Sequence, residues 1–515
     1  MTDSEAARDL LARVPALSPA DEHNRRLMAS VHPPEWKNPE PHGAYNLVVL
    51  GAGTAGLVAA AGAAGLGARV ALVERDLLGG DCLNVGCVPS KALIRSARAA
   101  ADVRAAGEFG VEVPSGARVD FGQVMQRLRR LRAEIAPHDS AARFRSLGVD
   151  VFLGEGRFTG RDSVEVGGRP LRFARAVVAT GGRAKAPPIP GLADAGHLTN
   201  ETVFSLTHLP ARLAVVGGGP IGCEMAQAFA RFGSRVTLLQ TAAQVLERED
   251  PDAAGLVADA LRRDGVDVRV GTTLVSVERT ADGARRLLVK RAGQIETLDA
   301  DEILVAVGRA PNLEGLGLDA AGVAFDAQGV RVDDHLRTTN PAVYAAGDVC
   351  SRYKFTHAAD AMARIVLRNA LFFGRARASA LTIPWCTFTS PELAHVGLSE
   401  RDAVAGGQRV EVIRVPLESV DRARLDGDAG LLKIVLRAGS DRILGATIVA
   451  PEAGNLISEL TLAMTAGIGL GKIADTIHPY PTQGEVVKRA ADAYNRTRLT
   501  PGVKKLFSTL LSWRR

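Results

Sequence analysis

Residues 45–56 read YNLVVLGAGTAG, a strand-like apolar run followed by glycines in the pattern G-x-G-x-x-G. An alanine-rich, helix-like stretch comes next, and residues 69–74, RVALVE, form a second apolar run that ends in an acid. This order is typical of a βαβ unit that binds a dinucleotide, because the glycines let the backbone approach a pyrophosphate and the acid accepts from a ribose hydroxyl. The candidate binding residues of this unit are Gly51, Gly53, Gly56 and Glu74.

A second unit of the same kind lies further along the chain. Residues 213–222, LAVVGGGPIG, repeat the strand and the glycines, and residues 235–240, RVTLLQ, form the next strand, which ends in an amide instead of an acid. One such motif alone could be an ordinary glycine-rich turn, but two complete units in one chain predict two dinucleotide sites. The candidate residues of the second unit are Gly217, Gly219, Ile221, Gly222 and Gln240.

Residues 79–91, GGDCLNVGCVPSK, follow directly on the first unit and carry two cysteines with four residues between them. Pro89 suits the first turn of a helix, which places Cys87 at a helix N-terminus, where a thiol pKa falls below its usual value of about 8.5. The ring that a Cys82–Cys87 disulfide closes is very short, so loop entropy gives it little stabilising effect. The spacing alone also fits a structural pair, but its place beside a dinucleotide unit favours a redox-active dithiol.

Length and composition limit the classes of protein to which the chain can belong. A chain of 515 residues has room for about three domains, and 46% hydrophobic residues with 54 glycines suit α/β layers joined by tight turns. Five cysteines argue against a secreted disulfide scaffold. The cysteines outside the dithiol are isolated in sequence and are expected to be packed small residues: Cys223, Cys350 and Cys386.

Charge and hydropathy indicate where the protein acts. The net charge of +6 is not gathered in long lysine–arginine runs, so we expect no nucleic-acid partner. Neither a secretory signal nor an apolar span long enough to cross a membrane is evident in the sequence. These features predict a cytoplasmic protein.

From Tyr45 to about Arg496 the sequence resembles the FAD-dependent pyridine nucleotide–disulfide oxidoreductases, the family of glutathione reductase, dihydrolipoamide dehydrogenase and mercuric reductase. Several motifs carry this resemblance besides the glycine motifs and the cysteine segment. They are ATGG at 179–182, GRAPN at 308–312, AGD at 346–348, FTSPE at 388–392 and VG at 396–397.

The resemblance implies an α/β fold with two Rossmann-like domains, one binding FAD and one binding NAD(P), and an α+β interface domain through which these enzymes form homodimers. A polar, proline-containing arm, expected to be extended, precedes them, and a basic amphipathic tail follows. The expected boundaries are 1–44 for the arm, 45–190 and 311–378 for the FAD domain, 191–310 for the NAD(P) domain, 379–495 for the interface domain and 496–515 for the tail.

The resemblance also implies roles for individual residues. Electrons would pass from NAD(P)H through the flavin to the Cys82–Cys87 disulfide, with Cys87 as the charge-transfer thiolate and Cys82 as the interchange thiol that attacks the substrate. Lys91 matches the lysine near the flavin, and Glu224 matches the acid that pairs with it, although a plain helix-surface role for Glu224 stays open. Besides Lys91, the resemblance assigns to FAD the residues Gly80, Gly156, Thr180, Gly181, Asp348, Thr356 and His357. It assigns Gly308 and Arg309 to NAD(P).

Gln240 bears on the choice of nucleotide. An acid at this position would accept from two ribose hydroxyls and favour NADH, whereas a neutral amide removes the repulsion of a 2′-phosphate without supplying a positive charge. Arg235 precedes the strand end by five residues and Arg248 follows it by eight, away from the usual phosphate site. We expect NADPH to be preferred, with NADH as the alternative.

Residues 478–485, HPYPTQGE, depart from the family pattern. Glutathione and lipoamide enzymes have a histidine at the position of Tyr480. That histidine is the acid–base catalyst for the dithiol of the partner subunit, and a glutamate that matches Glu485 accompanies it. A tyrosine with a pKa of about 10 is a poor base at pH 7, although it can donate a hydrogen bond. His478 would share a face with Tyr480 in an extended segment and could act as the base; the alternative is an ordinary hydrogen-bonding histidine.

The missing base favours an acceptor that thiolates bind directly, because oxidising a dithiol requires a base. Mercuric reductases also have a tyrosine in this region, and residues 243–251, AQVLEREDP, look most like that branch. Mercuric reductases also carry a C-terminal cysteine pair, whereas this chain has no cysteine after Cys386, so we expect mercury delivery to be inefficient.

The expected acceptor is therefore a soft metal ion bound as substrate by Cys82 and Cys87, without a structural metal site, or a small disulfide. Three alternatives stay open. They are reduction of a quinone or another membrane-associated acceptor, a dihydrolipoamide dehydrogenase-like reaction, and a non-catalytic flavin-bearing redox component.

The tail has the pattern of an amphipathic helix. Thr500 and Pro501 suit a helix start, and apolar residues then recur at helical spacing between lysines and arginines. One interpretation is that this helix docks on the dimer. The other is that residues 500–515 make a peripheral contact with a membrane.

Overall fold

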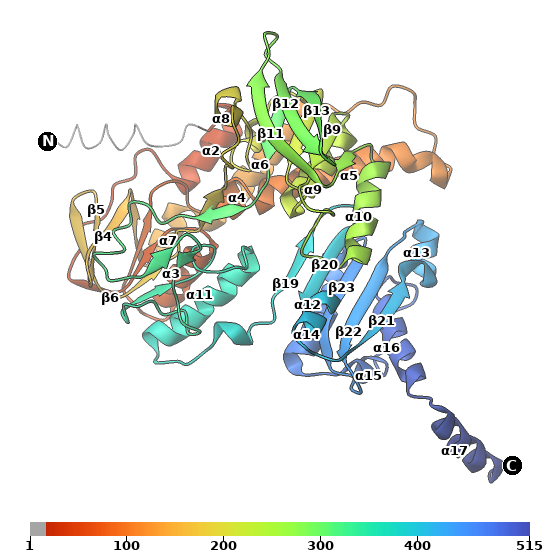
Figure 1. The fold of residues 1–515 in the computed structure, drawn as a ribbon. Coiled ribbons are helices and arrows are strands. Elements are labelled where there is room, and N and C mark those ends of the chain that lie inside the picture. The colour runs from red at the N-terminus through yellow and green to blue at the C-terminus, as the bar shows by residue number, and fades with distance from the viewer. Residues whose placement is uncertain (1–16) are drawn as a thin grey trace.

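The computed structural model describes residues 17–515, and three units make up the fold (Figure 1). The first two are α/β units with parallel strands, and the third has an antiparallel sheet flanked by helices. The predicted fold, two dinucleotide-binding units and a C-terminal α+β unit, is confirmed.

The first unit contains a sheet in the order β3-β2-β1-β6-β5-β4, to which β18 adds by pairing with β6. Strands β1 (Ala44–Leu50) and β2 (Val70–Glu74) are parallel neighbours joined by α3 (Thr54–Gly65). Their residues are mostly apolar and buried, as expected for parallel strands covered on both faces. The other elements are β3 (Val149–Leu153), β4 (Gly156–Gly160), β5 (Ser163–Val166), β6 (Arg169–Val178), β7 (Gly182–Ala184), β18 (Val343–Ala345), α4 (Gly80–Asn84), α5 (Cys87–Ala105), α6 (Phe121–Ile135), α7 (Ala141–Ser146) and α11 (Thr356–Leu371).

The turn from β1 into α3 requires glycine at two positions. Gly51 has a φ of +100°, and a Cβ there would lie 2.5 Å from the carbonyl oxygen of Ala179. A Cβ on Gly56 would lie only 1.8 Å from the carbonyl oxygen of Gly51. The helix can start this close to the strand only because both residues lack a side chain.

The second unit repeats this construction. Its parallel sheet has the order β10-β9-β8-β14, and the antiparallel strands β11, β12 and β13 form a separate sheet. Gly217 has a φ of +108°, and a Cβ on Gly222 would lie 1.9 Å from the carbonyl oxygen of Gly217. The elements are α8 (Leu192–Ala195), β8 (Arg212–Val216), α9 (Pro220–Phe232), β9 (Arg235–Leu239), α10 (Pro251–Arg263), β10 (Asp267–Arg269), β11 (Thr272–Arg279), β12 (Arg285–Arg291), β13 (Gln294–Ala300), β14 (Glu302–Val305) and β15 (Arg309–Pro311).

The third unit is built on a five-stranded antiparallel sheet in the order β19-β20-β23-β22-β21. Helix α14 contacts β20 and β23, and α16 contacts β21 and β22. The elements are β19 (Pro384–Thr387), β20 (Glu392–Gly397), α12 (Glu400–Ala405), β21 (Val410–Pro416), α13 (Asp421–Asp426), β22 (Leu431–Arg437), β23 (Ile443–Ala450), α14 (Ala453–Ala466), α15 (Leu470–Ile473) and α16 (Glu485–Thr497).

The arm differs from the expectation of an extended segment. Its first sixteen residues lie outside the described part of the chain, but residues 22–31 form α2 (Glu22–Val31), which contacts α6. Asp21 caps the helix by accepting from the backbone N–H of Asn24, and Leu27 and Val31, four residues apart on one face, are fully buried. The expectation of an extended arm was wrong here, because its prolines flank this helix and do not interrupt it.

The tail forms α17 (Pro501–Ser512), with Thr500 as N-cap and Pro501 in the first turn, as predicted. Figure 1 shows α17 projecting from the third unit, and none of its residues is buried in the described chain. Among residues 17–515, no helix is both long and apolar enough to cross a membrane.

Candidate redox and dinucleotide site

A continuous cavity of about 2490 Å³ lies between the three units. Both glycine turns, the two cysteines and Lys91 line it, together with Gln240 and Asp348. The structure therefore brings the two predicted dinucleotide sites and the predicted dithiol into one space, which is the arrangement that electron transfer between them requires.

Cys87 is the first residue of α5, and Cys82 lies in the preceding short helix α4. The Cys87 sulfur lies 3.4 Å from the hydroxyl oxygen of Thr356, at the start of α11. The pKa of the Cys87 thiol is lowered to about 6, because hydrogen bonds with Cys82 and Thr356 and the nearby charge of Lys91 stabilise the thiolate by more than partial desolvation disfavours it. The pKa of Cys82 is raised, because its thiol is hydrogen-bonded to Cys87 and is largely buried.

Lys91, one turn into α5 from Cys87, pairs with Glu224 of α9. The ammonium nitrogen lies 3.0 Å from a carboxylate oxygen of Glu224 and 4.3 Å from the ring centre of Phe388. Glu224 is only 5% exposed, and its second oxygen accepts from the backbone N–H of Phe388 at 2.9 Å. The plain helix-surface role for Glu224 was therefore wrong, since the side chain is buried and ties α9 to both other units.

The first glycine turn fits an FAD dinucleotide. A Cβ on Gly80 would lie 2.7 Å from the Cα of Gly53, so the two backbones approach each other closely, and both glycines line the cavity. The Glu74 carboxylate accepts from the backbone N–H of Ala52 at 2.6 Å, and burial raises the pKa of this carboxyl group. The turn is thus held open by an acid at the end of β2, and the N-terminus of α3 points into the cavity where a pyrophosphate would bind.

Arg309 lines the cavity and contacts the segment that carries the dithiol. Its guanidinium donates to Asp348 at 3.1 Å, to the carbonyl oxygen of Gly182 at 2.7 Å, and to Asp81, the neighbour of Cys82. Strand β15, which begins at Arg309, pairs with β7 in a separate two-stranded sheet, and the predicted contact of Arg309 with NAD(P) stays a prediction. Asp81 was not identified from the sequence as a candidate residue, although its position next to Cys82 could have indicated it.

The second glycine turn is held by Gln240 in the same way. Its side-chain oxygen accepts from the backbone N–H of Gly218 at 2.9 Å, which leaves the amide nitrogen as the available donor. Arg248 lines the same cavity, because the loop after β9 folds back onto Gly218; whether it reaches a nucleotide stays a prediction. Among the described residues, Arg248 forms no ion pair.

The remaining predicted residues of the cavity have defined surroundings. Thr180 donates to the carbonyl oxygen of Asn312 at 2.8 Å, and the His357 ring nitrogen lies 2.6 Å from the carbonyl oxygen of Pro384. A Cβ on Gly156 would lie 2.6 Å from Leu50, so this strand packs closely on β1. Gly181, Gly219, Ile221 and Gly308 all line the cavity.

The residues predicted to act in proton transfer lie in the third unit and do not line the cavity of the same chain. Tyr480 is 70% exposed and donates to Asp421 at 3.1 Å, which raises the pKa of the phenol. His478 does not share the exposed position of Tyr480: its ring lies 3.0 Å from the carboxylate of Glu459. Glu485 is the first residue of α16.

Of the other cysteines, Cys223 fits the expectation of a packed residue, whereas Cys350 and Cys386 are half-buried and Cys386 lines the cavity. Cys223 is fully buried, and burial raises its pKa and that of Cys386; the same holds for Cys350. Among residues 17–515, no group of three or more histidine, cysteine or acidic side chains is arranged to hold a metal ion.

Comparison with known proteins identifies relatives over most of the chain. The model of the pyridine nucleotide-disulphide oxidoreductase family matches residues 45–363, and that of the family's dimerisation domain matches residues 383–491. Mercuric reductase of Bacillus cereus is 34% identical over 89% of this chain and 73% of its own length. Dihydrolipoyl dehydrogenase of Thermus scotoductus is 35% identical over 88% of this chain and 98% of its own.

A solved structure is similar to a comparable extent. The Cu(II) complex of the HOCl-induced flavoprotein disulfide reductase RclA from Escherichia coli has a TM-score of 0.77 and 28% sequence identity, covering 88% of this chain and 100% of that chain. The match supports the arrangement of all three units.

The surroundings of Cys87 predict how its thiol titrates. In the reduced protein, the ultraviolet absorbance of the thiolate should rise with pH around a midpoint of about 6. Thr356→Val removes one hydrogen bond to the thiolate and should move this midpoint upward by about one unit. Thr202→Val, at another cavity-lining threonine, should leave it unchanged. A wild-type midpoint near the ordinary thiol value of about 8.5 would contradict the assignment.

Proposed function

Because the chain belongs to the pyridine nucleotide-disulphide oxidoreductase family, it is an FAD-dependent oxidoreductase that uses NAD(P)H, and we propose that it reduces a soft metal ion at the Cys82–Cys87 dithiol. The dimerisation-domain match supports a homodimer. The observation that carries the proposal is the Cys87 thiol, held as a thiolate beside Lys91 and open to the cavity that both glycine turns line.

Different residues of the chain have different roles in the proposed reaction. FAD, when bound, supplies two-electron transfer between the nicotinamide and the dithiol. Thr356 and Lys91 stabilise the Cys87 thiolate, and Glu224 fixes Lys91 in place. Cys82 and Cys87 bind the metal ion through sulfur, and the proton of the Cys82 thiol goes to solvent, since Cys87 is already a thiolate. When the two sulfurs close to a disulfide they release two electrons, which one Hg(II) ion or two Cu(II) ions accept.

Tyr480 supports a metal acceptor over a dithiol substrate. Oxidation of a dihydrolipoamide-like substrate requires a base that takes a proton from the substrate thiol. Asp421 raises the pKa of the Tyr480 phenol, so the phenol is already protonated at neutral pH and cannot serve as that base. A thiophilic metal ion needs no such base, because it binds the thiolate already present. Relatives named mercuric reductase and the Cu(II) complex of RclA support the same class of acceptor.

We assign the nucleotide as NADPH. The Gln240 amide nitrogen is free to donate, and Arg248 supplies a positive charge in the same cavity. Both groups suit a 2′-phosphate, whereas NADH-binding sites favour an acid at the end of this strand.

An acceptor panel tests the metal proposal. With NADPH as donor, the wild type should oxidise the nucleotide in the presence of Hg(II) or Cu(II), and Cys82→Ser should lower this rate on the order of a hundredfold because the dithiol is lost. Cys350→Ser, which alters a free cysteine that does not line the cavity, should retain activity.

Other acceptors in the panel decide between the alternatives. Quinone reduction that survives in Cys82→Ser would replace the metal proposal with a flavin-only reaction. Rapid oxidation of dihydrolipoamide by the wild type would replace it with a dehydrogenase reaction, and failure of NADPH and NADH to reduce the flavin would indicate a non-catalytic component.

We further propose that α17 binds an anionic lipid surface. The exposed apolar residues of this helix lie beside Lys504 and Lys505, and Arg514 and Arg515 follow. After Asp492 the sequence contains six basic residues and no acidic one, so the charge of this segment is complementary to anionic headgroups. A homodimer would present two such helices.

Vesicle co-sedimentation tests this surface. The full-length protein should bind vesicles that contain phosphatidylglycerol, and binding should weaken in high salt because the attraction is electrostatic. Leu510→Glu should reduce binding, whereas Leu66→Glu, at an exposed leucine of the first unit, should not. Equal binding by both variants, or loss of the dimer in Leu510→Glu, would contradict a membrane role and point to docking on the partner.

A further inference from the structure

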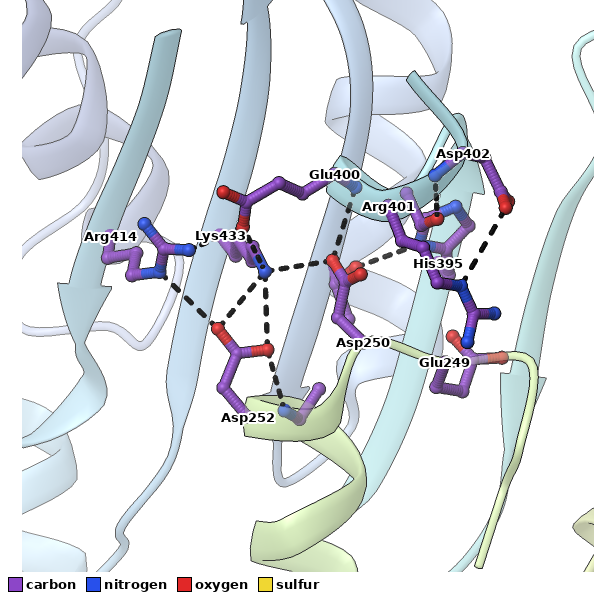
Figure 2. Close-up of polar contacts among 12 residues, drawn as sticks. Glu249, Asp250, Asp252, His395, Glu400, Arg401, Asp402, Arg414 and Lys433 are labelled. Atoms are coloured by element: carbon purple, nitrogen blue, oxygen red, sulfur yellow. Dashed lines mark hydrogen bonds and ion pairs between the residues drawn. The ribbon is translucent and has the colours of Figure 1, made fainter. Parts of the chain in front are cut away.

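The loop between β9 and α10 is held by the third unit through a buried lysine. Lys433 of β22 is 3% exposed at its side chain, and its nitrogen lies 2.9 Å from Asp250, 3.1 Å from Asp252 and 2.7 Å from Glu400. Asp250 and Asp252 belong to the loop and the start of α10, whereas Glu400 begins α12. Figure 2 shows Lys433 at the centre of this group, with the carboxylates converging on it from both units.

This group depends on its central cation. Asp250 is 2% exposed, and Arg414, beside Lys433 on β21, adds a second positive charge to Asp252 and Glu400 (Figure 2). Two cations thus face three carboxylates. A buried carboxylate without its partner is costly, so loss of Lys433 would push Asp250 out of its place.

Two further side chains of the third unit form hydrogen bonds with the same loop. Trp385 donates to Glu249 at 2.7 Å, and burial together with the neighbouring Asp250 raises the pKa of Glu249 to about 7. Arg401 donates to the backbone carbonyl oxygens of Glu247 and Arg248 at 3.3 and 3.1 Å. The third unit therefore holds five residues of the segment 247–252.

The loop in turn shapes the second glycine turn. The backbone N–H of Leu246 donates to the carbonyl oxygen of Gly218 at 2.7 Å, and Val245 packs against Gly218. Gly218 also donates to Gln240, as described above. A displacement of the loop would therefore change the turn and carry Arg248 away from the cavity.

We propose that Lys433 is a positioning residue for nucleotide binding: from the third unit it fixes the loop that carries Arg248 and shapes the turn at Gly218. The proposal rests on the proposed use of NADPH. It assigns to the dimerisation domain a direct part in the affinity for the nucleotide. The adenosine end of the nucleotide, with its 2′-phosphate, is the part that this loop serves.

The test compares nucleotide binding by holoenzyme variants. Lys433→Met keeps a side chain of similar length and removes the charge; it should raise the KM for NADPH and the inhibition constant of 2′,5′-ADP about tenfold, with a smaller change in kcat. Arg231→Met is the matched control, because Arg231 also joins the second unit to the third, through the Ser390 hydroxyl, while its ion pair with Asp264 lies within the second unit at the far end of α10 from the loop. It should lower the melting temperature and leave both constants within twofold.

A second variant keeps the proposal testable if Lys433→Met does not fold. Arg401 is half-exposed, so Arg401→Ala should leave the fold intact and raise the inhibition constant of 2′,5′-ADP about threefold. Unchanged constants in both variants, or an equal rise in Arg231→Met, would overturn the proposal. A wild type that binds neither NADPH nor NADH would instead contradict the proposed function.

Discussion

Close approach of strand and helix backbones at two glycine turns is the constraint on which the structure depends. A Cβ at Gly56 or Gly222 would lie within 2 Å of a carbonyl oxygen of its own turn, at 1.8 and 1.9 Å respectively. Without this approach, α3 and α9 could not begin at the cavity, and their N-termini could not face a pyrophosphate. The two turns are built alike, with Glu74 holding one and Gln240 holding the other.

Helices α5 and α9 connect these turns to the redox chemistry. Helix α9 begins at the second turn and carries Glu224, which pairs with Lys91 of α5, the helix that begins at Cys87. One partly buried ion pair thereby links the helix of the second glycine turn to the helix of the thiolate. On the other side, Arg309 joins Asp81, next to Cys82, to Asp348. The dithiol is thus fixed between two charged contacts that originate in different units.

Local patterns carried most of what the sequence predicted. The glycine turns, the start of α5 at Cys87 and the start of α17 at Pro501 each depend on residues that are neighbours in the chain, so spacing alone identified them. Contacts between distant segments were not accessible in this way. The ion pairs of Arg309 with Asp81 and Asp348 were not predicted, and Lys433 was not noticed, because only the packing of the three units shows which carboxylates surround these cations. The helix at residues 22–31 was missed because the proline-containing stretches 32–36 and 39–41, which follow it, suggested an extended arm.

The central claim is that electrons from the nucleotide reach the Cys82–Cys87 pair. Thiol titration of the oxidised protein under anaerobic conditions, before and after one equivalent of NADPH per chain, tests it without reference to any acceptor. The account predicts that NADPH is consumed and that two thiols per chain become titratable, with no such gain in Cys87→Ser. Consumption of NADPH without new thiols would contradict it.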